Sequence, residues 1–158
     1  MTPMPLIAIL LSALGLIPLI GCALGALGPD PVTASHMLQA LIGYSALILA
    51  FAGGIHWGFE LQTPQPNRLV GRLRLAIPAI ALLAAWAALM LPLVVAPASA
   101  LILLIVAYLG AILVEQRAAA FGALPQTYLW LRWGFTIPAI AMLITVFTLR
   151  LLGQTIEF

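Results

Sequence analysis

The chain has 158 residues, of which 65% are hydrophobic and 6% are charged. Soluble proteins carry roughly a quarter charged residues, so this composition excludes a soluble globular domain and indicates a small polytopic membrane protein. The net charge of +2 rests on six basic residues, all arginine, against four acids, which is too sparse for a nucleic-acid surface. A single cysteine excludes an internal disulfide and a cysteine metal cage.

Five apolar stretches are long enough to cross a membrane, because about 20 apolar residues span a bilayer. Proline- and glycine-containing breaks or charged residues separate them. The predicted spans cover about residues 6–27, 37–61, 73–95, 100–114 and 128–152. We therefore predict an all-α, polytopic membrane helix bundle in which residues 1–158 form a single transmembrane domain.

Five of the six arginines fall on one side of the predicted membrane. They are Arg68, Arg72, Arg74, Arg117 and Arg132. The opposite side holds only Arg150. Since arginine-rich connections stay in the cytoplasm, this asymmetry predicts that the N-terminus lies inside and the C-terminus outside.

The most informative segment is Gly-Gly-Ile-His-Trp-Gly-Phe-Glu at residues 53–60, near the end of the second span. His56 and Glu60 lie one helical turn apart, on one face, and ionisable groups in a membrane helix are costly. A zinc ion needs at least a third protein ligand, and on that side of the membrane only Glu115 could supply one. We interpret His56 and Glu60 as a structural pair. The alternatives are a ligand or lipid site, or, least favoured, a catalytic or metal centre.

Two hairpins, formed by spans two and three and by spans four and five, show the same charge pattern. Glu60 and Glu115 lie where the first helix of each hairpin ends, and Arg72 and Arg132 lie where the second begins. Both positions oppose the helix dipole, so cross-hairpin ion pairs, with Arg72 or Arg74 as the partner of Glu60, are expected to stabilise them. A headgroup or substrate site is the alternative. The candidate polar cluster contains His56, Glu60, Arg72, Arg74, Glu115, Arg117, Tyr128 and Arg132.

Short sequence matches suggest that these hairpins are repeats. Ile-Pro-Ala-Ile-Ala occurs at residues 77–81 and again at 137–141, each time with an arginine six residues before the proline. A parallel repeat of two hairpins would agree with the predicted topology and is common in transporters. Chance similarity between short apolar segments is the other interpretation.

Small residues at four-residue spacing predict close helix contacts. They are Gly21 and Gly25 in the first span, and Ala50, Gly54 and Gly58, with Gly53 beside them, in the second. Because a short turn joins these spans, we expect the two small faces to meet. Contact with another subunit is the alternative.

Two segments resemble a known family. Residues 44–61, around Gly-Gly-Ile-His-Trp-Gly-Phe-Glu, and residues 124–132, Leu-Pro-Gln-Thr-Tyr-Leu-Trp-Leu-Arg, resemble domain-of-unknown-function family 3429, the bacterial relatives of transmembrane protein 69. The similarity extends from Gly15 to about Leu152. Arginine is frequent in the family at the position of His56, which argues against histidine-specific chemistry. The resemblance implies a multi-pass protein of the bacterial inner (cytoplasmic) membrane and implies no activity.

Three functions agree with these features. We favour a non-catalytic accessory subunit or assembly factor of a larger inner-membrane complex. The same features favour a protein that is not an enzyme. The alternatives are a small proton- or anion-sensitive carrier or channel with a site at His56 and Glu60, and a lipid- or quinone-binding membrane protein. We expect no catalytic residue, metal or cofactor, although a bound lipid would fit. The expected partners are membrane lipids and other membrane subunits or a second copy, and not nucleic acid.

Overall fold

The computed structural model describes residues 6–62, 68–122 and 124–153, and nearly all of them are helical. The helices are α1 (Leu6–Gly25), α2 (Pro31–Gln62), α3 (Arg68–Val94), α4 (Pro97–Ala120) and α5 (Gln126–Leu151). All five are long and apolar enough to cross a membrane. The prediction of an all-α bundle with five spanning helices is therefore confirmed.

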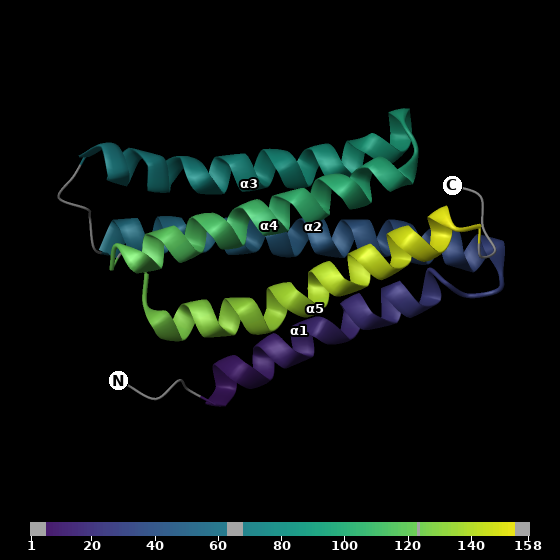
Figure 1. Cartoon of the computed structure of the whole chain (residues 1–158), viewed down its shortest axis with the longest axis horizontal. Helices are drawn as coiled ribbons and strands as arrows, with labels where there is room; N and C mark the ends of the chain where they lie inside the picture. The colour runs from purple at the N-terminus through teal and green to yellow at the C-terminus, as the bar shows by residue number, and fades with distance from the viewer. Residues whose placement is uncertain (1–5, 63–67, 123, 154–158) are drawn as a thin grey trace.

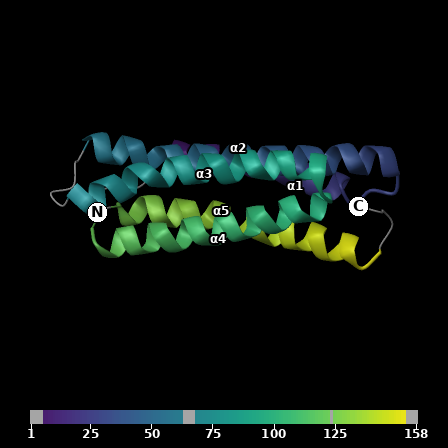
Figure 2. The ribbon, with the colours of Figure 1, turned by 90° about the horizontal axis from the view of Figure 1, so that it is seen from above.

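The helices lie roughly along one long axis, and each runs in the direction opposite to the helix before it in the chain (Figure 1). Each packs against its neighbour in the chain, and α1 also packs against α5, which closes the ring. Seen from above, α2 and α3 form one layer and α4 and α5 another (Figure 2). Helix α2 also contacts α4 across the ring, so α2 and α4 each pack against three other helices.

The two ends of the bundle differ in charge. The ends of α2 and α4 lie at one end of the bundle, together with the starts of α1, α3 and α5 (Figure 1). Five arginines belong to the helix segments at this end, and we call it the arginine end. At the other end, Arg150 lies in the last turn of α5.

The helices extend beyond several predicted spans. Helix α2 begins at residue 31 rather than 37, α3 at 68 rather than 73, and α4 continues to residue 120 rather than ending at 114. Hydropathy marks the part of a helix that suits hydrocarbon, whereas local chemistry ends the helix. Helix α4 ends only where Gly122 adopts a positive φ of 70°, a conformation that glycine adopts without strain.

The start of α2 shows that local chemistry directly. Asp30 accepts a hydrogen bond from the backbone N–H of Thr33 at 2.9 Å, and Pro31 occupies the first helical position. Hydrogen bonds from the side chain and backbone of Thr33 lower the pKa of the Asp30 carboxyl. This cap accounts for the six helical residues that precede the predicted span.

Helix α1 packs through its C-terminal half. Its buried residues are Leu19 and Ala23, whereas the large side chains from Leu6 to Leu14 are mostly exposed. The Tyr44 hydroxyl of α2 donates to the carbonyl of Gly15 at 2.8 Å, near the point where this contact ends. In Figure 1 the start of α1 diverges from the other helices.

The expected meeting of the α1 and α2 glycine faces is wrong. A Cβ atom on Gly21, Gly54 or Gly58 would meet nothing within 4 Å, because these residues face outward. The close contacts lie elsewhere. A Cβ on Gly25 would lie 2.6 Å from Cγ of Met37, and one on Gly53 would lie 2.7 Å from Cβ of Ala81.

The physical reason lies in the face that α2 buries. Gly53 is in contact with α3, where a Cβ would also lie 3.3 Å from Cα of Pro78. Gly54 is the next residue, about 100° around the helix, and therefore points away from α3. Ala50, the third member of the predicted face, is partly buried against the core.

Candidate functional site

A buried ion pair joins α4 to α5 near the arginine end. The Nε atom of Arg132 donates to both carboxylate oxygens of Glu115, at 3.2 and 3.0 Å. The hydroxyl of Tyr128 donates to Oε1 of Glu115 at 3.3 Å. Arg132 and Glu115 are 6% and 2% exposed, so water contributes little to either charge. Their pairing follows the prediction for this hairpin.

His56 brings α2 into the same cluster. Its Nε2 atom lies 3.5 Å from Oε1 of Glu115, and its side chain is buried. Within the part of the chain that the structure describes, Nδ1 of His56 has no hydrogen-bond partner. His56 therefore contacts Glu115 of the second hairpin. The sequence had placed this acid on the same side of the membrane as His56.

Tyr108 of α4 packs against this cluster. The guanidinium of Arg132 lies 5.8 Å from the centre of the Tyr108 ring, within the range of a cation–π contact. The Tyr108 hydroxyl donates to the carbonyl of Ser45 at 2.9 Å, which ties α4 to α2 deeper in the bundle. Tyr108 is not among the residues predicted for the cluster. Its position seven residues before Glu115, on the same face of a helix, is the signal that could have indicated it.

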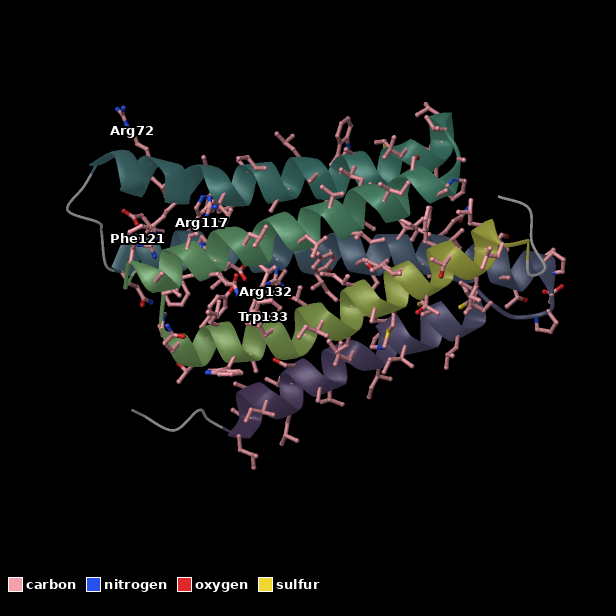
Figure 3. All side chains as sticks on the ribbon, in the orientation of Figure 1. Arg72, Arg117, Phe121, Arg132 and Trp133 are labelled. Carbon is pink, nitrogen blue, oxygen red and sulfur yellow. The ribbon has the colours of Figure 1, made fainter. Side chains whose placement is uncertain are left out.

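A second ion pair joins α2 to α3. Nη1 of Arg74 donates to Oε2 of Glu60 at 2.9 Å, and both residues are buried. Gly71 leaves room for this carboxylate, since a Cβ there would lie 2.7 Å from Oε1 of Glu60. Of the two arginines predicted as partners of Glu60, Arg74 forms the pair, whereas Arg72 is exposed and extends away from the bundle (Figure 3).

The candidate cluster is therefore two separate sites. Glu115, Tyr128, Arg132 and His56 come together between α2, α4 and α5, with Arg132 lying between the ribbons of α4 and α5 in Figure 3. Glu60 and Arg74 form the pair between α2 and α3. Arg72 and Arg117 are exposed and belong to neither site.

The opposite end of the bundle holds a third buried cation. Arg150 donates from Nε and Nη2 to the carbonyl of Ala26, and from Nη2 to the carbonyl of Ala34, at 3.1 to 3.2 Å. These carbonyls lie just beyond the end of α1 and in the first turn of α2. At the carbonyl of Ala26 the cation satisfies a backbone group that follows the C-terminal end of α1 and complements the dipole of that helix.

The four-residue cluster around Glu115, which we call the Glu115 cluster, can hold charge and hydrogen-bond a ligand. Across residues 6–62, 68–122 and 124–153, no group of three histidine, cysteine, aspartate or glutamate side chains could hold a metal ion. Arginine and tyrosine are donors, and a carboxylate already accepts from both of them. The groups that remain for a ligand are the unused N–H groups of Arg132, which can donate to an acceptor oxygen, and Nδ1 of His56.

Comparison with known proteins identifies the family and nothing more specific. Residues 4–148 match the model of the family described as "Protein of unknown function (DUF3429)". The chain therefore belongs to this family, as the two sequence segments suggested. No curated protein and no solved structure matches the chain.

Proposed function

We propose that this DUF3429 family member is a non-catalytic accessory subunit or assembly factor of a larger complex in the bacterial inner membrane. The observation that carries the proposal is a stripe of exposed residues on α2, which we call the α2 stripe. It consists of Leu47, Phe51, Gly54, Gly58 and Leu61. The spacing alternates between four and three residues, which is the spacing of a seam between two packed helices.

The glycines distinguish this stripe from an ordinary lipid-facing surface. Leu47, Phe51 and Leu61 are 66%, 74% and 77% exposed, as lipid-facing side chains are. Gly54 and Gly58 lie between them, and a Cβ on either would meet nothing within 4 Å. Glycine lowers helix propensity and offers lipid no side chain, but it lets a second helix approach closely. Close packing of a helix from another subunit against Gly54 and Gly58 would compensate for their lower helix propensity.

Orientation forms part of the proposal. The arginine end would face the cytoplasm, with the start of α1 inside and the end of α5 outside, because arginine-rich connections are retained there. Arg72 and Arg117 are exposed at this end, where anionic headgroups would also attract them.

Site-specific photocrosslinking tests the proposal in intact membranes. A photoreactive residue at position 54 or 58 is expected to form a crosslink of constant mass to one defined membrane protein. The matched control is position 83 on α3, where Leu83 is 63% exposed and lies in none of the crevices described below. Crosslinks to lipid alone from positions 54 and 58 would contradict the proposal.

Particle size in mild detergent gives a second readout. The native particle is expected to contain other defined subunits, and Gly54→Leu with Gly58→Leu should release the chain as a small particle. Leu83→Phe should leave the large particle intact. A small particle that holds only this chain and lipid in the wild type would reject the subunit function.

A further inference from the structure

A crevice between α1, α2 and α5 leads to the Glu115 cluster. Its volume is about 380 Å³, and Tyr128 and Arg132 line one end of it. Its walls are largely apolar and aromatic, with Tyr44, Phe51 and Phe135 among them. Helix α1 forms one wall of it with Leu11, Ser12 and Gly15, and the start of this helix diverges from the other helices (Figure 1).

Arg132 has N–H groups at that end of the crevice that are not used in hydrogen bonds among the described residues. Among the described residues, its hydrogen bonds run from Nε to Glu115, and none runs from Nη1 or Nη2. The guanidinium carries five N–H groups, so a second acceptor can bind while Glu115 remains paired. The side chain is 94% buried, and so an acceptor that reaches it from the crevice would be bound away from bulk water.

The depth of Arg132 matches the ester and phosphate level of a phospholipid. Helix α5 has 26 residues, or about 39 Å, close to the full thickness of a bilayer with its headgroups. Arg132 lies six residues from the start of α5, which is about 9 Å. The headgroup layer is roughly 5–8 Å thick, so Arg132 lies just below it and can extend upward.

We propose that this crevice is a binding site for one phospholipid, whose phosphodiester accepts hydrogen bonds from Arg132 while an acyl chain lies along the aromatic wall. Planar guanidinium groups bind phosphate oxygens in pairs, which a lone ammonium does not. The apolar walls then contact an acyl chain of the bound phospholipid, a molecule that is already present in the membrane. This proposal does not rest on the subunit function, and the two sites meet at Phe51, which belongs both to the α2 stripe and to the crevice wall.

A second crevice on the opposite side of the molecule provides an internal control. It lies between α3 and α4, has a volume of about 350 Å³, and is lined by apolar residues such as Ile80 and Ala107. An acyl chain can enter it, but no arginine is present to hold a phosphate. Lipid there should exchange freely.

Native mass spectrometry of the delipidated chain tests the site. The protein is titrated with dioleoylphosphatidylglycerol and, separately, with dioleoylglycerol, which has the same chains and no phosphate. One phosphatidylglycerol is expected to bind saturably, at least tenfold more tightly than dioleoylglycerol. Equal binding of the two would overturn the proposal, because the crevice would then accept any acyl chain.

Variants locate the bound lipid. Arg132→Lys keeps a cation beside Glu115 but loses the second set of donors, and is expected to weaken phosphatidylglycerol binding at least tenfold. Ser12→Phe, on the α1 wall of the crevice, should do the same by filling it, whereas Ser12→Ala and Ala107→Phe should bind as the wild type does. Thermal unfolding of each variant shows whether it is folded.

Either of two results would overturn the assignment. One is wild-type affinity in folded Arg132→Lys. The other is wild-type affinity in Ser12→Phe, which does not touch the ion pair and so tests the site even if Arg132→Lys fails to fold. Loss of binding in Ala107→Phe alone would place the lipid in the α3–α4 crevice and would likewise contradict the proposal.

Discussion

The two hairpins carry the same residue types but are held together differently. In the α2–α3 hairpin, Glu60 and Arg74 pair with each other, and the helices approach closely because Gly53 and Gly71 have no side chain. In the α4–α5 hairpin, the two helices are bridged by a larger polar cluster, in which Glu115 accepts from Arg132 and Tyr128. A shared charge pattern therefore does not specify a shared mode of packing.

The difference follows from the depth of each acid. Glu60 is 8% exposed and lies two residues before the end of α2, whereas Glu115 is 2% exposed and lies five residues before the end of α4. A carboxylate that is deeper in the membrane depends more on donors from the protein, and Arg132 and Tyr128 supply them to Glu115. Substitution of each acid, and of the residues that pack beside it, tests this ranking.

Glu115→Leu should be the most damaging change. It leaves Arg132 buried without its carboxylate, and removal of one partner from a buried pair costs about 3–5 kcal/mol. Adding Arg132→Leu should recover most of that loss, because no unpaired charge would remain. Unfolding of the purified protein in detergent measures both. A double variant as unstable as the single one would mean that the pair itself stabilises the bundle.

Gly53→Ala should cost about 1–3 kcal/mol by overpacking the α2–α3 contact. The added methyl group would lie 2.7 Å from Cβ of Ala81. Its neighbour provides the control, since Gly54→Ala places a methyl in open space and should be neutral or slightly stabilising in the isolated chain. Equal unfolding free energies for the two variants would contradict the close approach.

Glu60→Gln should destabilise the bundle by about 1–2 kcal/mol, less than Glu115→Leu, because the pair lies nearer the water and keeps a hydrogen-bonding amide. Adding Arg74→Gln should reduce this loss, whereas adding Arg72→Gln should not, since Arg72 is exposed. The same unfolding assay applies. Rescue by Arg72→Gln would restore the pairing that the sequence suggested.

Tyr108→Phe should have the smallest effect, about 0.5–1 kcal/mol, because it removes only the hydrogen bond to the Ser45 carbonyl. The ring would still lie beneath Arg132. Tyr108→Leu removes the cation–π contact as well and should therefore cost more. Identical losses for Phe and Leu would show that the ring contributes nothing to holding Arg132.

The fold could be predicted from the sequence because hydrocarbon imposes a simple rule. An apolar stretch of about 20 residues forms a helix there, and four of the five predicted spans reach that length. The fourth, 100–114, is shorter, and α4 extends it to residue 120. Helix ends were predicted less well, as α4 shows, because they depend on features such as the positive φ of Gly122.

The site was only partly predictable, for a geometric reason. Spacing along one chain showed that His56 and Glu60 share a face, but not which neighbouring helix each would meet. The register between helices decided that His56 contacts Glu115 and that Arg74, rather than Arg72, contacts Glu60. A shift of two residues along α3 rotates a side chain by about 200° around the helix axis. The sequence does not directly specify which residue of α3 faces α2.

The placement of each acid and its arginine in consecutive helices constrains how the protein enters the membrane. Glu115 precedes Arg132 by 17 residues, so during synthesis the acid emerges first and its counter-ion follows in the next helix. A charged side chain at the centre of a lone inserting helix costs roughly 2.5–3.5 kcal/mol. Helices α4 and α5 are thus best inserted together, as are α2 and α3, with each newly made acid held near the membrane surface until its arginine arrives.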